Sequence, residues 1–408
     1  MMGTLVRFEL KKILDNRAGM AACALVPCML VAIAVMNLLT MDTVDVATGE
    51  VLHGPEAQQA YRQMQESHAG TLDDDRIADD VAKFERADQL SQETEGLYDL
   101  SNKEIVERYG LPFWQETRGV LEDGYYMEVV GTLDSASPRA TSLKDGAMAR
   151  ISGILENGFW GYHPYTDSEK AYWQSLAGEI SWPLEWGYDG GWHYALTWKG
   201  FAGLAIVALC IALSGVFASE YHDRTAAVAL PTRRGKKVLP IAKVVAAFLF
   251  ATAYFCVLTL GIVAIHVSIY GTEGWDLPIQ VTYGLDNPYP LTVGQAVILS
   301  HVLGYLVALG MVALTLLLSS KMRSTMPVAV IPMSIVLLGI IGLFSTPLAK
   351  IALLTPFSGL SYVCSTMVSY AFGAFVLDLP AILAVLYLAM LIVCVPLTIR
   401  SFRRHQVT

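Results

Sequence analysis

The chain has 408 residues, of which 54% are hydrophobic and only 16% are charged, and its net charge is −9. This composition is typical of membrane proteins, and the acidic balance argues against a nucleic-acid-binding function. The apolar residues form several long runs, and one large acidic block separates the first two of these runs.

The first 17 residues predict an amphipathic helix that lies along the membrane surface. Its apolar positions recur at helical spacing and are Val6, Leu10, Ile13 and Leu14. Its polar positions Glu9, Lys11 and Lys12 are candidates for contact with a cytoplasmic partner. A simple positively charged anchor explains the same segment equally well.

Residues 18–40 predict the first transmembrane span, because an apolar helix needs roughly 20 residues to cross a bilayer. The tripeptide Ala32-Ile33-Ala34 resembles the cleavage site of a signal peptide. However, the apolar run is about 22 residues long and continues past this point, which favours a retained span.

Residues 41–198 predict a large, α-rich extracytoplasmic domain between spans one and two. Segment 42–198 holds 29 of the 37 Asp and Glu but 11 of the 28 Lys and Arg, a local charge of about −18. Helices are expected over 55–67, 73–90 and 91–109. The second half is rich in Trp and Tyr, which form either a domain core with an interfacial belt or a ligand-binding surface. No cysteine occurs in this segment, so disulfides are not expected there.

Residues 199–408 predict a bundle of five further spans, at about 200–219, 244–268, 293–318, 326–345 and 379–399. The segment 346–378 is apolar but is interrupted by proline and glycine, so partial helices on the outer side are expected rather than a seventh span. His301 lies within a predicted span and is a candidate for the translocation path. A neutral histidine satisfied by a neighbouring helix is the simpler interpretation.

The basic residues predict the orientation of the spans. Outside the acidic block, 15 of the 17 Lys and Arg lie in segments 1–17, 220–243, 321–323 and 400–404. Loops rich in Lys and Arg stay in the cytoplasm. The sequence therefore predicts a multi-pass protein of the plasma (inner) membrane with both termini cytoplasmic.

Motifs for soluble enzyme chemistry are absent from the sequence. The Gly235-Lys236 pair lacks the upstream glycine and the following Ser or Thr of a Walker A motif. There is no His-Glu-x-x-His, no Gly-x-Ser-x-Gly, and no cysteine pair at metal-ligand spacing. We therefore predict no catalytic, cofactor-binding or metal site, and do not expect an enzyme.

The cytoplasmic loop 220–243 carries the most specific pattern in the chain. In order, it contains Glu220, Arg224, Thr225, Ala229-Leu230, Pro231, Arg233, Arg234 and Lys243. This order of an acid, a threonine, an apolar turn, a proline, arginine and a final lysine resembles the membrane subunits of type 2 ATP-binding cassette (ABC) exporters. Residues 8–14 also look like the opening helix of that family. The enlarged domain after the first span resembles one subset of its members.

The resemblance implies a permease subunit that exports an amphipathic substrate, such as a peptide, a drug or a lipid-like molecule. Such a permease forms a homodimer, or a heterodimer with a second permease, in the lipid bilayer and binds cytoplasmic ABC ATPase subunits. ATP and Mg would be bound by the ATPase and no cofactor by this chain. The polar residues of loop 220–243 would then couple ATP hydrolysis to the spans.

Two other classes of function stay open. A membrane-anchored sensor or assembly scaffold would use the external domain to bind a ligand and the bundle to transmit the signal. A secondary transporter is disfavoured, because carboxylates are scarce in the predicted spans.

Overall fold

The structure is a computed structural model that describes residues 2–45, 47–135, 140–160, 163–197, 199–223, 237–341 and 348–404. It is mostly helical and separates into two compact units. Unit 1 consists of Met1–Ala32, Ala195–Ile265 and Val297–Thr408, and unit 2 of Ile33–Tyr194 and His266–Ala296.

Five helical segments in the described part of the chain are long and apolar enough to cross a membrane. They are Arg17–Leu39 (α2), Lys199–His222, Leu239–Tyr270 (α15), Val293–Lys321 (α17) and Leu379–Arg404 (α21). The second of them comprises the turn Lys199–Phe201 (η2) and the helices Ala202–Leu213 (α12) and Gly215–His222 (α13). The chain is therefore a helical multi-pass membrane protein.

The predicted span 326–345 corresponds to a shorter apolar element. The helix Thr325–Leu338 (α18) continues into the turn Gly339–Ile341 (η3). The remaining residues of the predicted span, 342–345, lie outside the described ranges.

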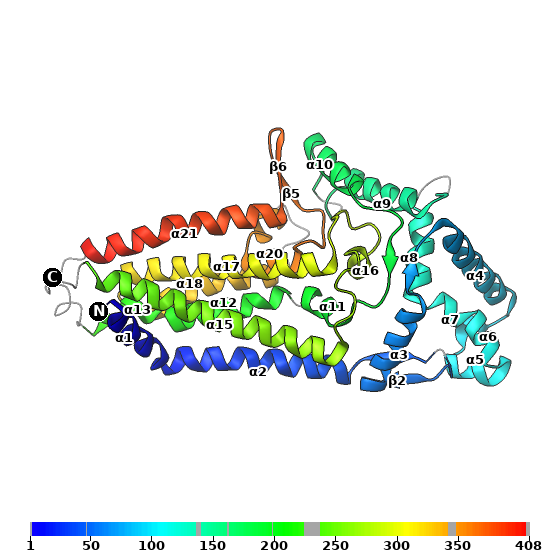
Figure 1. Ribbon diagram of the computed structural model, residues 1–408, viewed down its shortest axis with the longest axis horizontal. Coiled ribbons are helices and arrows are strands. Elements are labelled where there is room, and N and C mark those ends of the chain that lie inside the picture. The colour runs from blue at the N-terminus through cyan, green and yellow to red at the C-terminus, as the bar shows by residue number, and fades with distance from the viewer. Residues whose placement is uncertain are drawn as a thin grey trace. The chain divides into compact units, whose positions relative to one another are not determined.

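Within unit 1 the long helices run side by side, and helix Met2–Leu14 (α1) lies at the same end as the last turn of α21 (Figure 1). The apolar stretches of the second span and of α17 are each 61% buried, compared with 22% for α2, α15 and α21. The second span and α17 therefore form the centre of the bundle. Close approach depends on glycine, since a Cβ on Gly19 of α2 would lie 2.6 Å from the Ala212 Cα of α12.

The segment before the last helix differs from the expected series of partial helices. Its first part contains the short helices Ala349–Ala352 (α19) and Pro356–Tyr362 (α20). Its second part is an antiparallel hairpin of strands Ser369–Phe372 (β5) and Phe375–Asp378 (β6). The two-residue turn begins with Gly373, whose φ of 71° suits glycine, and this turn accounts for the hairpin.

Unit 2 contains short helices and two small antiparallel strand pairs. The helices are Gly54–Ser67 (α3), Asp74–Glu93 (α4), Leu97–Asp99 (η1), Asn102–Tyr109 (α5), Leu111–Glu116 (α6), Arg118–Leu121 (α7), Gly124–Leu133 (α8), Leu143–Asn157 (α9), Asp167–Gly178 (α10) and Gln280–Tyr283 (α16), with Gly190–Thr197 (α11) leading out of it. The strands Asp42–Val44 (β1) and Val51–His53 (β2) form one pair, and Gly70–Thr71 (β3) and Glu185–Trp186 (β4) form the other.

Polar caps explain where several of these helices begin. Asp73 accepts a hydrogen bond from the Arg76 N–H at the start of α4, and Ser101 with Glu104 forms a capping box at α5. The expected single helix over 91–109 is wrong. Gly96, with a φ of 75°, separates α4 from α5 and opens the turn η1 instead.

The aromatic second half of the segment 42–198 supplies a core to unit 2. Its buried aromatic side chains are Tyr125, Phe159, Tyr165, Trp173, Trp186 and Tyr188. The core interpretation is therefore confirmed for these residues. A second apolar cluster, of Leu97, Ile105 and Trp114, forms beneath α5 and α6.

Unit 2 also includes His266–Ala296, a segment within the range 199–408 that was predicted as the five-span bundle. Arg150 forms ion pairs with Glu128 at 2.8 Å and with Asp286 at 3.3 Å. The Leu285 N–H donates to Glu128 at 3.0 Å, and the Leu285 side chain is fully buried. The unit is thus assembled from two segments that are distant in sequence.

His193 in unit 2 predicts a pH-dependent contribution to stability. Its Nδ1 lies 3.1 Å from the Asp189 carboxylate, which also accepts from the Thr282 hydroxyl. Burial lowers the pKa of His193, but the bond to Asp189 more than offsets this and the pKa is raised. Histidine has a pKa of about 6.5 in an unfolded chain. Because the pKa of His193 is raised in the fold, its protonated form stabilises the fold fully below that value, and this stabilisation is lost as the pH rises through the folded pKa. We expect His193→Asn to lower the melting temperature more at pH 5.5 than at pH 8. An equal decrease at both pH values would contradict a stabilising pair of protonated His193 and Asp189.

Candidate functional site

A cluster of four charged side chains joins three helices at one end of unit 1. Lys243 of α15 contacts Glu9 of α1 at 2.8 Å and Glu220 of α13 at 2.7 Å. Lys12 of α1 lies 3.2 Å from Glu220 and 3.5 Å from Glu9. We call Glu9, Lys12, Glu220 and Lys243 the charge cluster. The charge cluster contains two carboxylates and two ammonium groups, so its net charge is zero.

Lys243 is the centre of the charge cluster. The residue is 1% exposed, compared with 4% for Glu9 and 5% for Glu220. Its Nζ also donates to the Val216 carbonyl at 2.9 Å, so its three N–H groups match three acceptors on two helices. Removing such charges from water costs several kcal/mol per ion, and the cost is offset only when each charge is paired. The cluster therefore holds α1, α13 and α15 together in one arrangement.

The buried face of helix α1 includes a carboxylate. Val6, Glu9 and Ile13 are buried, whereas Leu14 is 52% exposed. Lys243 supplies the opposite charge that makes burial of this carboxylate possible.

Ser319 of α17 connects the centre of the bundle to the charge cluster. The second span is interrupted where α12 ends at Leu213 and α13 begins at Gly215. Ser319 Oγ donates to the Ser214 carbonyl at 2.7 Å and accepts from the N–H groups of Phe217 and Ala218, both at 3.0 Å. The fully buried Ser319 thus satisfies backbone groups at this break. Ser319 was not among the residues predicted from the sequence, although a serine near the end of an apolar run was a usable signal.

A cavity of about 620 Å³ lies beside the charge cluster and is lined by α1, α2, α12, α13, α15 and α18. Besides the cluster itself, its walls carry the carboxylates of Asp15 and Asp223. The lining therefore contains four carboxylates and two lysines. This excess of negative charge favours a positively charged group as the occupant.

The predicted site residues fall into four groups, three of which lie in the described ranges. Glu9, Lys12, Glu220 and Lys243 meet in the charge cluster, although they were predicted as parts of two separate elements. Lys11 is exposed on α1 and lies outside the cluster. His301 lines a different pocket of unit 1.

The remaining predicted coupling residues, Arg224, Thr225, Pro231, Arg233 and Arg234, fall in residues 224–236, outside the described ranges. This stretch connects α13, which carries Glu220, to α15, which carries Lys243. Both ends of the loop are therefore anchored in the charge cluster.

No family model, curated protein or solved structure matches the chain. Among the described residues, no group of three or more His, Cys, Asp or Glu side chains is arranged to hold a metal ion. None of the six cysteines forms a disulfide. The charge cluster is therefore the candidate site on which a functional argument rests.

Proposed function

We propose that this chain is the permease subunit of an ABC exporter, which moves an amphipathic substrate outward with ATP hydrolysed by a separate cytoplasmic ATPase. In this proposal α18 belongs to a sixth span, both termini are cytoplasmic and unit 2 is external. Two permease chains form the dimer. The observation that carries the proposal is the charge cluster at both ends of loop 224–236.

The cluster supports coupling because it converts movement of one loop into movement of several helices. A protein that binds loop 224–236 would push on α13 and α15 together, since Glu220 and Lys243 lie 2.7 Å apart. The Glu9 contact would carry α1 with them. Ser319 would carry the movement to α17 at the centre of the bundle. Packed helices tied in this way shift between discrete arrangements rather than bending continuously.

The acidic cavity beside the cluster fits the same proposal. A cytoplasmic ATPase that docks at this end would place an Arg or Lys side chain against Asp15 and Asp223. Charge-assisted hydrogen bonds from such a group are among the stronger polar contacts at an interface.

Replacing both Arg233 and Arg234 with alanine is expected to weaken binding of the ATPase. The change removes two cations from the loop but leaves the charge cluster intact, so membrane insertion should be normal. The tagged variant is purified from its native host, and the amount of ATPase that co-purifies with it is measured. This amount should be about tenfold lower than for the wild type if each arginine makes a charge-assisted contact. Substrate export by cells should fall in parallel.

The control is Arg400→Ala with Arg404→Ala, which removes two positive charges from exposed positions near the end of α21. Normal export and normal ATPase content in the Arg233 and Arg234 variant would contradict the coupling role. Recovery of a kinase in place of an ATPase would favour the sensor hypothesis.

A further inference from the structure

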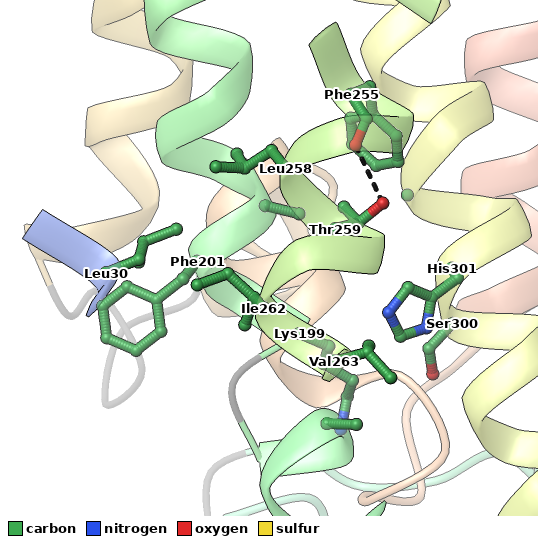
Figure 2. A pocket seen from close by; sticks show the side chains of 13 residues that line it. Leu30, Lys199, Phe201, Phe255, Leu258, Thr259, Ile262, Val263, Ser300 and His301 are labelled. Atoms are coloured by element: carbon green, nitrogen blue, oxygen red, sulfur yellow. Dashed lines mark hydrogen bonds between the residues drawn. The ribbon is translucent and has the colours of Figure 1, made fainter. Parts of the chain in front are cut away.

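A second pocket in unit 1 combines an apolar wall with a small polar end (Figure 2). It is lined by residues of η2, α12, α15 and α17, with Leu30 of α2 at one side. Lys199 opens the segment Lys199–His222, and Glu220 of the charge cluster lies near the end of that segment. The pocket is therefore at the opposite end of the second span from the proposed coupling site.

The polar end of the pocket is made by Lys199, Ser300 and His301. Lys199 is 7% exposed and Ser300 is 3% exposed. The buried Ser300 Oγ has no hydrogen-bond partner among the residues that the structure describes. His301 Nδ1 donates to the Val297 carbonyl at 2.7 Å, which leaves Nε2 as the ring atom able to contact a ligand. A buried hydroxyl without a partner is costly, and a ligand acceptor would satisfy it.

The other end of the pocket is apolar. Figure 2 shows Leu30, Phe201 and Leu258 on the side away from Ser300 and His301. Thr259 lies between the two ends, but its hydroxyl is already bonded to the Phe255 carbonyl at 2.8 Å. The lining thus matches a molecule with one polar and one hydrocarbon part.

Charge and size narrow the class of ligand. The lining contains one lysine and no carboxylate, so its field favours an anion. The space open to water is about 50 Å³, enough for a few water molecules. A space of this size takes a carboxylate and the first part of a single chain, whereas a folded or branched polar group does not fit.

We propose that this pocket binds a single-chain acidic amphiphile, with its carboxylate on Lys199 and Ser300 and its chain along Phe201, Leu258 and Leu30. The inference deepens the proposed function, on which it rests, by naming the class of substrate as an acidic amphiphile. Lys199 supplies a charge-assisted hydrogen bond, and the Ser300 O–H donates a second one. Bilayer lipid can deliver such a molecule to the apolar side of the pocket.

Binding to the purified full chain without any ATPase tests this assignment separately from export. The probe is a long-chain fatty acid that carries a photoreactive diazirine on its chain, used in non-ionic detergent micelles. We expect saturable labelling of the peptides that contain Leu30, Phe201 or Leu258, because these residues line the path of the chain. Unlabelled fatty acid should compete, whereas the methyl ester and the alcohol of the same chain length should not. This competition uses the wild-type protein and is independent of how any variant folds.

The variants Lys199→Met and Ser300→Ala identify the contacts. Lys199→Met should weaken labelling about tenfold or more, and Ser300→Ala by about threefold. The matched control is Lys350→Met, which removes a half-buried lysine outside the pocket and should leave labelling unchanged. Equal competition by the ester, or unchanged labelling of Lys199→Met, would overturn the proposal. Stronger competition by a two-chain anionic phospholipid than by the fatty acid would overturn the single-chain assignment.

Discussion

Replacing Lys243 with methionine is expected to lower the free energy of unfolding by about 3–5 kcal/mol, the usual loss when one partner of a buried ion pair is removed. Lys243 is 1% exposed and contacts Glu9 and Glu220 at 2.8 and 2.7 Å. Its loss leaves two buried carboxylates beside the half-exposed Lys12. Unfolding in mixed micelles, followed by circular dichroism as the fraction of denaturing detergent rises, measures the difference.

Two further variants separate charge from packing. Lys237→Met removes an exposed lysine just before α15 and should change stability by less than about 0.5 kcal/mol. The double variant Glu9→Gln with Lys243→Met removes one charge of each sign, so it should be more stable than Lys243→Met alone. If Lys243→Met and Lys237→Met unfold at the same fraction of denaturing detergent, the charge cluster does not hold the helices together.

Hydropathy predicted the long spans because the length and composition of an apolar run are local properties. Five of the six predicted spans correspond to helices long enough to cross a membrane. The sixth, 326–345, is described as a helix only through Ile341, with Pro332 inside it. Local sequence therefore indicated where apolar helices form, and the end of this one at 345 stays a prediction because residues 342–345 lie outside the described ranges.

The charge cluster could not be predicted as a unit from the sequence. Lys12 and Glu220 are 208 positions apart, and Glu9 and Lys243 are 234 apart. Each residue stood out by its position near a span, but their meeting depends on how α1, α13 and α15 pack. The same packing explains the burial of Glu9, because spacing alone assigns such a carboxylate to solvent. Lys199 was missed for a related reason, since a lysine at the end of a span usually extends to water.

The second segment of unit 2 was missed because its partners are distant. Glu273 pairs with Arg62 at 2.8 Å, and Asp286 pairs with Arg150 at 3.3 Å. In sequence, His266–Ala296 contains turn-forming glycines and prolines and reads as a connection between spans. Ile279 and Leu285 of this segment are nevertheless fully buried.

A fragment of residues 42–194 is therefore expected to be much less stable than the same fragment joined to residues 266–296 by a short Gly/Ser linker. Ile279 and Leu285 are both fully buried, and burial of each such side chain contributes about 1.5–3 kcal/mol. The linked fragment also keeps the ion pair between Arg150 and Asp286. We expect a difference of at least about 3 kcal/mol in the free energy of unfolding, measured by urea titration with tryptophan fluorescence.

The linker can be short, because the Gly191 N–H donates to the Gly271 carbonyl at 3.0 Å and so brings the two segments together at their ends. A synthetic peptide of residues 266–296, added in trans to fragment 42–194, should restore part of the lost stability. In a linked fragment that carries Leu285→Ser, the free energy of unfolding should decrease toward that of the unlinked fragment. This change removes a buried apolar side chain but keeps the covalent connection. Equal urea midpoints for the linked and unlinked fragments would mean that the first segment completes its core alone.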